Sequence, residues 1–524
     1  MSQITAKKVK KKPFVRQVWG QEKNEPEKTV DECAVRRQKL MQAVQRGVPP
    51  YPQVFSRPQP IAEVLSGRVV GDRDVTIAGR LMRIRVIGKL VFADLHDGTQ
   101  KMQIQIDGGR TVTIAGERGK SVENGFSAFL DLIDPGDVIS VRGEFILTKT
   151  NEKTIRVEQF QLLSKALRPL PDKWHGIRDR ELRYRKRYLD LIANSSTREL
   201  FERRSRFIRA FRSFLDGRGF TEVETPVLEH VPGGAEAEPF VTRHNTLGID
   251  LYLRISLELH LKRLIVGGFS RVYEIGKVFR NEGMSTEHLQ EFTELEFYMA
   301  YADYEDLQQF VQQCYEAVIL ETFGSLEFAY QGKTLNFARP WKVVDYVTAV
   351  SDATGVNILS EDENGLRKAI TRFGGTPDPR VGRGRLVDLL YKKSVRPSLI
   401  QPTLLINHPV CVSPLAKRHR DNPELTERIT VVVNGSEVGN GFSELNDPLD
   451  QRERFEQQMN LRDAGDREAQ MTDEDFLEAI EHGLPPTAGF GVGIDRLFML
   501  LTDQPSVRDV VLFPTLRPMG KNDE

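Results

Sequence analysis

Carboxylates and an arginine recur at two-residue spacing in one part of the sequence. The runs VYEIGKVFRNEG and EFTELEFYMAYADY each alternate as a β-strand does, and residues two apart on a strand share a face. Arg280 and Glu282 therefore project together from the first run. Glu294, Glu296 and Tyr298 project together from the second run, which we expect to pair with the first in antiparallel fashion. Such a face is either a polar site or a solvent-exposed face with salt bridges, and the spacing favours neither.

A second acidic strand is predicted in NGSEVGNGFSELND, where Asn440, Phe442 and Glu444 share one face. Glu437 is out of phase with them and joins that face only if the neighbouring glycines permit a bulge. Two carboxylates so placed can hold Mg²⁺, a cation that takes oxygen ligands and shares them with phosphates. An acidic strand at the surface is the alternative interpretation.

A third motif, GLPPTAGFGVGIDRLFMLLTD, is a glycine-rich entry into an apolar helix with Arg496 in the first turn. Helix N-termini favour anions, so an arginine there opposes the helix dipole. Arg496 either binds an anion or pairs with Asp495. Glu258 has a simpler explanation, because an acid that follows Ser256 as N-cap stabilises the first turn of a helix.

The bulk composition limits the classes of protein. A chain of 524 residues predicts two or three domains, and its 74 Lys and Arg balance 74 Asp and Glu, so nucleic-acid binding requires local basic patches. Cys33, Cys314 and Cys411 have neither metal nor disulfide spacing, which indicates a reducing compartment. No run approaches the roughly 20 apolar residues of a membrane span. We therefore expect a cytoplasmic protein without a membrane partner.

A basic arm lies near the N-terminus and consists of Lys7, Lys8, Lys10, Lys11 and Lys12. It is a solvated chain end, an RNA contact or an organellar address. Organellar targeting is therefore left open by the sequence.

The elements that position these motifs are separated by prolines. The segment from Asp31 to Arg46 has helical spacing and precedes a proline-rich stretch over residues 49–60. Short alternating runs from Val75 to about Leu163 predict a β-barrel or sandwich. A basic helical segment follows the prolines near residue 170, and we expect it to act as a hinge with an RNA-facing side.

From Ser195 onward, long helices alternate with hairpin-forming strands, which predicts an α+β domain. The helix expected over Thr197 to Leu215 and the extended FTEVETPVLE suit either a subunit interface or an ordinary core. The predicted segments are an N-terminal extension with a helix (1–69), the barrel (70–166), a basic linker (167–194), a catalytic domain (195–517) and a tail (518–524).

In this order the motifs resemble those of class II aminoacyl-tRNA synthetases. GFTEVETP is similar to motif 1, FRNEG with EFTELEFY to motif 2, and GFGVGIDRLFMLL to motif 3. VPGGAEAEPF, YLRISLELHLKRLIVGGFSRVYEIG, EFYMAYADY, GFSELNDP and HGLPPTAG resemble the lysyl-tRNA synthetases in particular. The resemblance covers about residues 75–517. It implies an N-terminal OB-fold barrel, a catalytic domain with an antiparallel sheet flanked by helices, and a homodimer.

The resemblance implies a lysine–tRNA ligase that activates L-lysine with ATP and Mg²⁺ and transfers lysine to the 3′ end of tRNA(Lys). The implied lysine-binding residues are Gly234, Glu258, Glu296, Tyr298, Asn440, Phe442 and Glu444. Acids dominate this set. An ammonium offsets their desolvation, whereas an aspartate or asparagine substrate leaves them unpaired at several kcal/mol each.

The implied ATP-binding residues are Arg280 for the α-phosphate and as the catalytic residue, Arg496 for the γ-phosphate, Glu282 and Phe292 for adenine, and His288 and Glu437. Glu437 and Glu444 are the implied metal ligands. In the barrel, Phe92 is expected to stack on an anticodon base and Gln103 and Glu152 to bond uracil edges, as single-stranded RNA is read. Phe92 as a core aromatic is the alternative.

Two departures from the family pattern are present. Thr430 stands where the family usually has a glutamate, and HLQEFT, from His288 to Thr293, replaces His-Asn-Pro-Glu-Phe-Thr. Our hypothesis is an active but kinetically atypical enzyme. The alternative is a catalytically weak tRNA-binding or regulatory paralogue. A synthetase-like enzyme that lysylates a protein is disfavoured, since such relatives typically lack the barrel.

Overall fold

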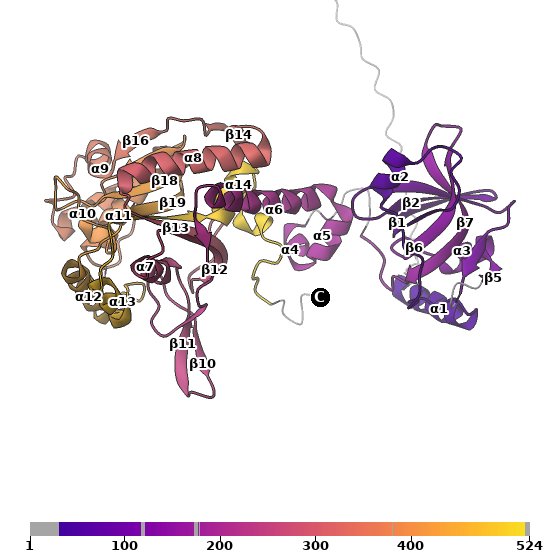
Figure 1. The fold of residues 1–524 in the computed structure, drawn as a ribbon, viewed down its shortest axis with the longest axis horizontal. Helices are drawn as coiled ribbons and strands as arrows, with labels where there is room; N and C mark the ends of the chain where they lie inside the picture. The colour runs from indigo at the N-terminus through magenta and orange to yellow at the C-terminus, as the bar shows by residue number, and fades with distance from the viewer. Residues whose placement is uncertain (1–30, 117–120, 172–176, 178, 380, 519–524) are drawn as a thin grey trace, which may run out of the picture. The chain divides into compact units, whose positions relative to one another are not determined.

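The computed structural model describes residues 31–116, 121–171, 177, 179–379 and 381–518 (Figure 1). The chain divides into two compact units, residues 1–173 and 174–524, and the division falls inside the expected linker. Each unit is described by itself. The basic arm from Lys7 to Lys12 lies outside the described residues.

The first unit is a β-barrel. Its described strands are β1 (Val75–Ile87), β2 (Leu90–His96), β3 (Lys101–Asp107), β4 (Thr113–Ala115), β5 (Ser121–Asn124), β6 (Val138–Leu147) and β7 (Lys153–Ser164). They lie in the order β3-β2-β1-β6-β7-β4-β5, and an additional parallel pairing of β3 with β7 closes the barrel. Alternation directs Val91, Ala93 and Leu95 of β2 into the core, as expected for a strand with one buried face. The OB-fold prediction is confirmed.

Three helices pack on the barrel: α1 (Glu32–Gln45), α2 (Ile61–Gly67) and α3 (Gly125–Leu132). The helix predicted between Asp31 and Arg46 is confirmed, with the Asp31 carboxylate capping its N-terminus. The helix is more closely attached than its charged sequence suggests, because the buried Arg36 donates to the carbonyls of Pro135 and Ala166 at 3.0 and 3.3 Å.

The second unit is built on a mixed sheet. The strand order is β16-β17-β18-β19-β20-β13-β12-β8, with parallel pairing only at β16–β17 and β12–β8 among the described pairs. The strands are β8 (Thr221–Glu222), β12 (Arg271–Phe279), β13 (Glu291–Ala300), β16 (Lys342–Asp345), β17 (Thr403–Ile406), β18 (Arg428–Val433), β19 (Ser436–Ser443) and β20 (Thr487–Gly493). The antiparallel pair expected from the two acidic runs is β12 with β13. The α+β prediction is confirmed.

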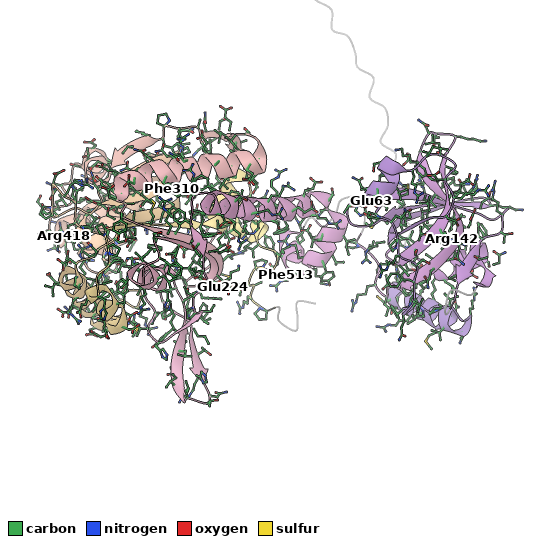
Figure 2. All side chains as sticks on the ribbon, in the orientation of Figure 1. Glu63, Arg142, Glu224, Phe310, Arg418 and Phe513 are labelled. Atoms are coloured by element: carbon green, nitrogen blue, oxygen red, sulfur yellow. The ribbon has the colours of Figure 1, made fainter. Side chains whose placement is uncertain are left out.

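One face of this sheet carries α6 (Ser195–Asp216), α8 (Tyr304–Phe323) and α14 (Ile494–Leu501), which share a core with its strands. Phe310, labelled in Figure 2, contacts the rings of Phe220 and Phe297 at 5.5 and 5.3 Å. A capping box at Asp303 begins α8, and Gly324 ends it with a φ of 71°. This face is therefore a conventional apolar core.

The opposite face carries α7 (Glu258–Val266), α12 (Pro448–Asp463) and α13 (Glu474–Glu481), as Figure 1 shows. A separate cluster joins α9 (Tyr346–Thr354), α10 (Glu363–Arg372) and α11 (Arg383–Ser394). The remaining helices are α4 (Arg180–Arg185), α5 (Arg187–Ala193), η2 (Arg396–Ser398), η3 (Val410–Val412) and η4 (Val507–Val510). The remaining strands are β9 (Leu228–Glu229), β10 (Val241–His244), β11 (Ile249–Leu253), β14 (Glu327–Tyr330) and β15 (Lys333–Asn336).

Strand alternation decides which face holds chemistry. On β13 the odd-numbered Leu295 and Phe297 enter the core shared with α8, so the even-numbered Glu294 and Glu296 face the other way. In the described part of the chain, no helix has the length and apolar character needed to cross a membrane.

Candidate active site

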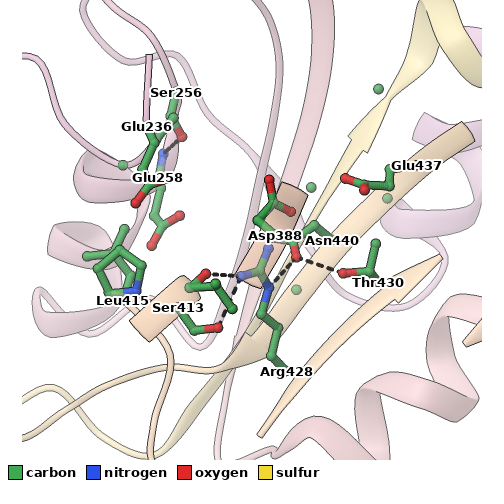
Figure 3. Close-up of a pocket in the computed structure, with 18 of the residues that line it drawn as sticks. Glu236, Ser256, Glu258, Asp388, Ser413, Leu415, Arg428, Thr430, Glu437 and Asn440 are labelled. Carbon is green, nitrogen blue, oxygen red and sulfur yellow. Dashed lines mark hydrogen bonds between the residues drawn. The ribbon is translucent and has the colours of Figure 1, made fainter. Parts of the chain in front are cut away.

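A cavity of about 410 Å³ lies on the face of the sheet opposite α8 (Figure 3). Its lining includes every residue predicted from the sequence to bind lysine or ATP, although they come from elements far apart in the chain. In Figure 3, Ser256 and Glu258 lie at one end of the cavity, and Thr430 and Glu437 lie at the other. The first is called the acidic end below and the second the phosphate end.

Glu296 is fixed at the acidic end by three hydrogen bonds. Its Oε1 accepts from the Ser256 hydroxyl at 2.7 Å and from the Leu257 amide at 2.9 Å, and its Oε2 accepts from the Tyr298 hydroxyl at 2.7 Å. Ser256 also accepts from the Glu258 amide at 3.2 Å, although the residue at the N-cap position of α7 is Leu257. The network holds Glu296 and Tyr298 in one geometry.

A lysine of the chain itself lies between two of the predicted carboxylates. Lys262 is fully buried, and its Nζ pairs with Glu258 Oε1 at 2.5 Å and with Glu444. The Phe442 ring lies 5.3 Å from the same ammonium, a cation–π distance. The sequence analysis missed Lys262, but its spacing of four from Glu258 on a helix is a recognisable ion-pair signal.

The charge state of this group follows from burial. Burial raises the pKa of both Glu258 and Glu444, and the Lys262 charge opposes that rise. Burial acts to lower the pKa of Lys262, but the two carboxylates outweigh it and the pKa is raised. Glu294 has its pKa raised to about 8 by burial and by the neighbouring Glu296. One internal cation therefore faces several buried carboxyl groups, which leaves room for a second cation.

Two glycines keep the acidic end open. A Cβ at Gly489 would overlap Glu444 Oε1 and the Tyr298 ring. Gly234 has a φ of 84°, and a Cβ there would lie 2.9 Å from Ser256 Oγ and 3.0 Å from Glu258 Cβ. Because these two residues have no side chain, space remains beside the carboxylates.

Arg280 lines the cavity beside Phe292 and Glu294. It lies one residue after β12, continues the ladder by donating its amide to the Gln290 carbonyl at 2.8 Å, and stands 5.0 Å from the Phe292 ring centroid. Its NH2 is 3.8 Å from Glu294 Oε2. Glu282 also lines the cavity, and burial raises the pKa of its carboxyl.

Arg496 lies in the first turn of α14, as predicted, and is not paired with Asp495. Asp495 pairs with Arg204 and accepts from the Thr293 amide at 2.9 Å. Arg496 donates to the Glu437 carbonyl at 2.5 Å, and its buried Nε has no hydrogen-bond partner among the described residues. A buried, incompletely satisfied guanidinium suits an anion.

The altered loop from His288 to Thr293 is well integrated. Leu289 is buried in the core, and Gln290 donates to the Glu282 carbonyl at 2.9 Å. His288 lies 2.7 Å from Ser285 Oγ, and burial together with the Arg496 charge lowers the pKa of its imidazole. The loop therefore still places His288 in the lining of the cavity.

The residues present do not form the expected metal site. β19 carries the predicted bulge, where Val431 pairs with Gly439 and Val432 with Glu437, so Glu437 does line the cavity. Glu437 and Glu444, however, stand at opposite ends of β19, roughly 20 Å apart along a strand at about 3.3 Å per residue. The expectation that both bind one ion is corrected accordingly. Within the described ranges, no group of three or more His, Cys, Asp or Glu is placed to hold a metal.

Thr430 supplies no charge at the phosphate end. Its Oγ1 lies 3.1 Å from His408 Nε2 and 3.3 Å from Asn440 Oδ1, which also accepts from Arg428 Nε at 2.8 Å (Figure 3). Asn440 is thus held between Thr430 and Arg428. Position 430 therefore offers no carboxylate that could bind a metal together with Glu437.

The outward face of the barrel carries the residues predicted to contact the anticodon. Phe92 is half-buried and outside the barrel core, unlike its neighbours in β2, so the core alternative is not realised. Its cross-strand neighbours are Arg85 and Gln105, and Gln105 pairs in turn with Arg156. Paired residues share a face of the sheet. Phe92 therefore lies in a row between Arg85 and Gln105, and Arg156 at the end of the row is ion-paired with Glu144.

The other two predicted anticodon residues lie near that row. Gln103 accepts from the Thr154 hydroxyl at 3.0 Å and occupies the next outward row of β3. Glu152 lies in the loop between β6 and β7 and is exposed. The sequence analysis missed Arg85, Gln105 and Arg156. Strand alternation within β1, β3 and β7 was the signal that could have found them.

Known proteins resemble the chain along most of its length. Residues 179–517 match the family described as tRNA synthetases class II (D, K and N), and residues 75–163 match the OB-fold nucleic acid binding domain. Relatives named lysine–tRNA ligase come from Moorella thermoacetica (47% identical; 93% of this chain, 98% of the relative) and Roseiflexus castenholzii (48%; 92% and 98%). A third, from Thermotoga maritima, is 45% identical over 93% of this chain and 96% of the relative.

Proposed function

Because the chain belongs to the lysine–tRNA ligases, ATP-dependent class II synthetases, we propose how its cavity activates L-lysine and charges tRNA(Lys). The observation that carries the assignment is the set of charges lining one cavity. Glu258, Glu296 and Glu444 are buried carboxylates gathered at one end, and the same cavity is lined by Arg280 and Arg496, as a substrate with an ammonium and a nucleotide with phosphates require.

Lysine binds with its side-chain ammonium beside Glu444 and Tyr298 and its α-amino end beside Gly234 and Glu258. Glu444 has one oxygen directed to Lys262 and the other beside Gly489, where the missing side chain leaves access. A carboxylic acid or amide side chain in that place would leave the buried acid without a cation, at a cost of several kcal/mol. This disfavours aspartate and asparagine as substrates.

In the first step a lysine carboxylate oxygen attacks the α-phosphorus of ATP. An O–P bond forms, the bond to the oxygen that bridges to the β-phosphate breaks, and pyrophosphate leaves with the electron pair. Arg280 stabilises the charge on the α-phosphate oxygens, and Phe292 presents its ring to adenine with Glu282 at the edge. A lysine carboxylate is already ionised, so no general base is needed.

In the second step the 3′-hydroxyl of the terminal ribose attacks the carbonyl carbon of lysyl-adenylate. The ester bond forms, the bond between the carbonyl carbon and the phosphate oxygen breaks, and AMP leaves with the electron pair while the hydroxyl proton passes to a phosphate oxygen of the departing AMP. The fixed positions of Glu296 and Tyr298 keep the lysyl group in place between the steps, and this positioning supplies much of the rate.

Recognition of tRNA(Lys) is assigned to the outward face of the barrel. Phe92 stacks on a base, Arg85 contacts a backbone phosphate, and Gln103 and Glu152 bond base edges. Binding of this kind weakens as salt increases.

Mg²⁺ is assigned to the nucleotide substrate, which enters as its Mg²⁺ complex, and not to a pair of protein carboxylates. Glu437 is the predicted ligand that lies at the phosphate end. A homodimer in the cytoplasm is also part of the proposal. Val227, Leu228 and Val241 are exposed after α6, in or beside the hairpin β10–β11 that projects from the domain in Figure 1. Such exposed apolar residues suit a partner subunit.

Charging of purified tRNA(Lys) with radiolabelled lysine tests the proposal. We expect acid-precipitable lysyl-tRNA that is hydrolysed by mild alkali, depends on ATP and fails to form with tRNA(Asp). Charging of tRNA(Asp) with aspartate by the same protein would overturn the assignment of the acidic end.

A further inference from the structure

Two cations that no sequence motif singled out stand at the phosphate end. Lys392, on α11, lines the cavity, and its Nζ lies 2.7 Å from Asp388 Oδ2. Arg396, in η2, lies with NH1 3.5 Å from Glu437 Oε1. Both side chains come from the segment between β16 and β17, away from the three sequence motifs.

These cations converge with Arg496. The backbone carbonyl of Glu437 accepts from Arg496, while its carboxylate faces Arg396. Burial and the Arg496 charge lower the pKa of His288 most, the Glu287 carboxylate raises it, and the charges of Lys392 and Arg396 lower it further. Three cations therefore lie near His288, with the carboxylates of Glu287, Asp388 and Glu437 beside them.

The carboxylates nearby do not saturate the two cations. The side chains of Lys392 and Arg396 are 39% and 29% exposed, and those of Asp388 and Glu437 are 31% and 33% exposed. Ion pairs with this much solvent contact are weak, so they exchange readily for a more highly charged partner. A triphosphate is such a partner.

The same end lacks the carboxylate expected at position 430. That position is a threonine hydrogen-bonded to His408 and Asn440, and Glu444 is paired with Lys262 at the acidic end. Lys392 and Arg396 therefore lie close to a place where an expected metal-binding carboxylate is absent.

We propose that Lys392 and Arg396 bind the β- and γ-phosphates of ATP and supply positive charge that a Mg²⁺ ion held by the protein would otherwise provide. The inference rests on the proposed function. Arginine suits bidentate contact with phosphate, and lysine suits it as a point charge. In the activation step the two side chains would stabilise the negative charge on departing pyrophosphate, together with Arg496.

Calorimetric titration of ATP into the full-length protein tests the proposal, in EDTA and in excess Mg²⁺. The variants are Lys392→Gln and Arg396→Gln, and the matched control is Lys393→Gln, the exposed next residue of α11. We expect each variant to weaken ATP binding in EDTA by about tenfold, the size of one charge-assisted hydrogen bond. The control should match the wild type. Lysine binding should be unchanged in all three, which shows that the fold is intact.

A double variant separates contact from long-range charge. Asp388→Asn with Lys392→Gln removes the ion pair without changing net charge, and ATP binding should stay weakened. Wild-type affinity in the double variant, equal effects in Lys393→Gln, or unchanged affinity in both single variants would overturn the proposal. Lysine-dependent pyrophosphate exchange by the wild type is measured alongside. If the wild type lacks exchange, the proposed function fails, whereas normal exchange with unaffected variants refutes only this inference.

Discussion

Replacing Glu444 by glutamine isolates the charge that selects lysine. The change is isosteric, and Lys262 keeps Glu258 as a partner at 2.5 Å, so the internal ammonium stays paired. The Glu444 side chain is 1% exposed. Truncating one partner of a buried charge pair costs about 2–5 kcal/mol, so we expect KM for lysine to rise by about 30-fold or more. KM for ATP should change little, because the phosphate end is untouched.

A matched control is available one strand away. Glu427 is also a buried glutamate, but its carboxylate accepts from Arg420 and Ser443 at 2.7 and 2.6 Å and does not line the cavity. Glu427→Gln should leave KM for lysine unchanged, whatever it does to stability. Steady-state pyrophosphate exchange at varied lysine and at varied ATP gives both constants. Equal KM values for lysine in the two variants, or an equal rise for both substrates in Glu444→Gln, would refute the reasoning.

Three further predictions use the same assay or tRNA charging. Gly489→Ala places a methyl group against Glu444 Oε1 and the Tyr298 ring and should abolish lysine activation; normal activation by this variant would contradict the role of Gly489. Lysine binding needs ionised carboxylates, and burial raises the pKa of Glu258 to about 7 and of Glu294 to about 8. KM for lysine should therefore rise as pH falls from 8 to 6. A KM that does not change with pH would count against those pKa shifts. Phe92→Ala should raise KM for tRNA by about tenfold, because the lost stacking is worth about 1–3 kcal/mol. Pyrophosphate exchange should not change. An unchanged KM for tRNA would show that Phe92 is not part of the anticodon site.

The same pKa shifts have a consequence for stability. A carboxyl group whose folded pKa is raised binds more protons in the folded state than in the unfolded state between about pH 4.5 and pH 8. Stability of the unliganded protein should therefore fall as pH rises through this window. Added lysine should offset the fall, because its ammonium stabilises the ionised carboxylates, and thermal denaturation with and without lysine measures both effects. A fall in stability that added lysine does not offset would contradict the inference that the lysine ammonium stabilises the ionised carboxylates.

Short-range periodicity was enough to predict much of the site. Alternation placed Glu294, Glu296 and Tyr298 on one face, because a half-buried strand must separate its apolar and polar residues. The bulge that brings Glu437 into phase followed from Gly439 and its neighbours, since only that backbone accommodates the close approach of Phe490. The alternation of side chains between the two faces of a strand is a local property, so it can be predicted from the sequence alone.

Contacts between distant segments could not be predicted in this way. Lys262 meets Glu444 only because α7 packs across β19, and Lys392 reaches the phosphate end only because α11 folds back on the sheet. Glu437 and Glu444 are too far apart for one metal ion because they lie seven residues apart along extended chain. The motif suggested one metal site only because both acids belong to one strand-like run. Which charged side chains meet in a cavity depends on tertiary packing, and the spacing of residues in the sequence does not predict it.

Pyrophosphate exchange with each of the twenty amino acids tests the central claim most directly. Incorporation of labelled pyrophosphate into ATP should occur with lysine and be absent with aspartate and asparagine, because only an ammonium compensates the buried carboxylates of Glu258, Glu296 and Glu444. Exchange with aspartate or asparagine, or no exchange with any amino acid from protein that binds ATP, would contradict it and favour a tRNA-binding paralogue without lysine activation.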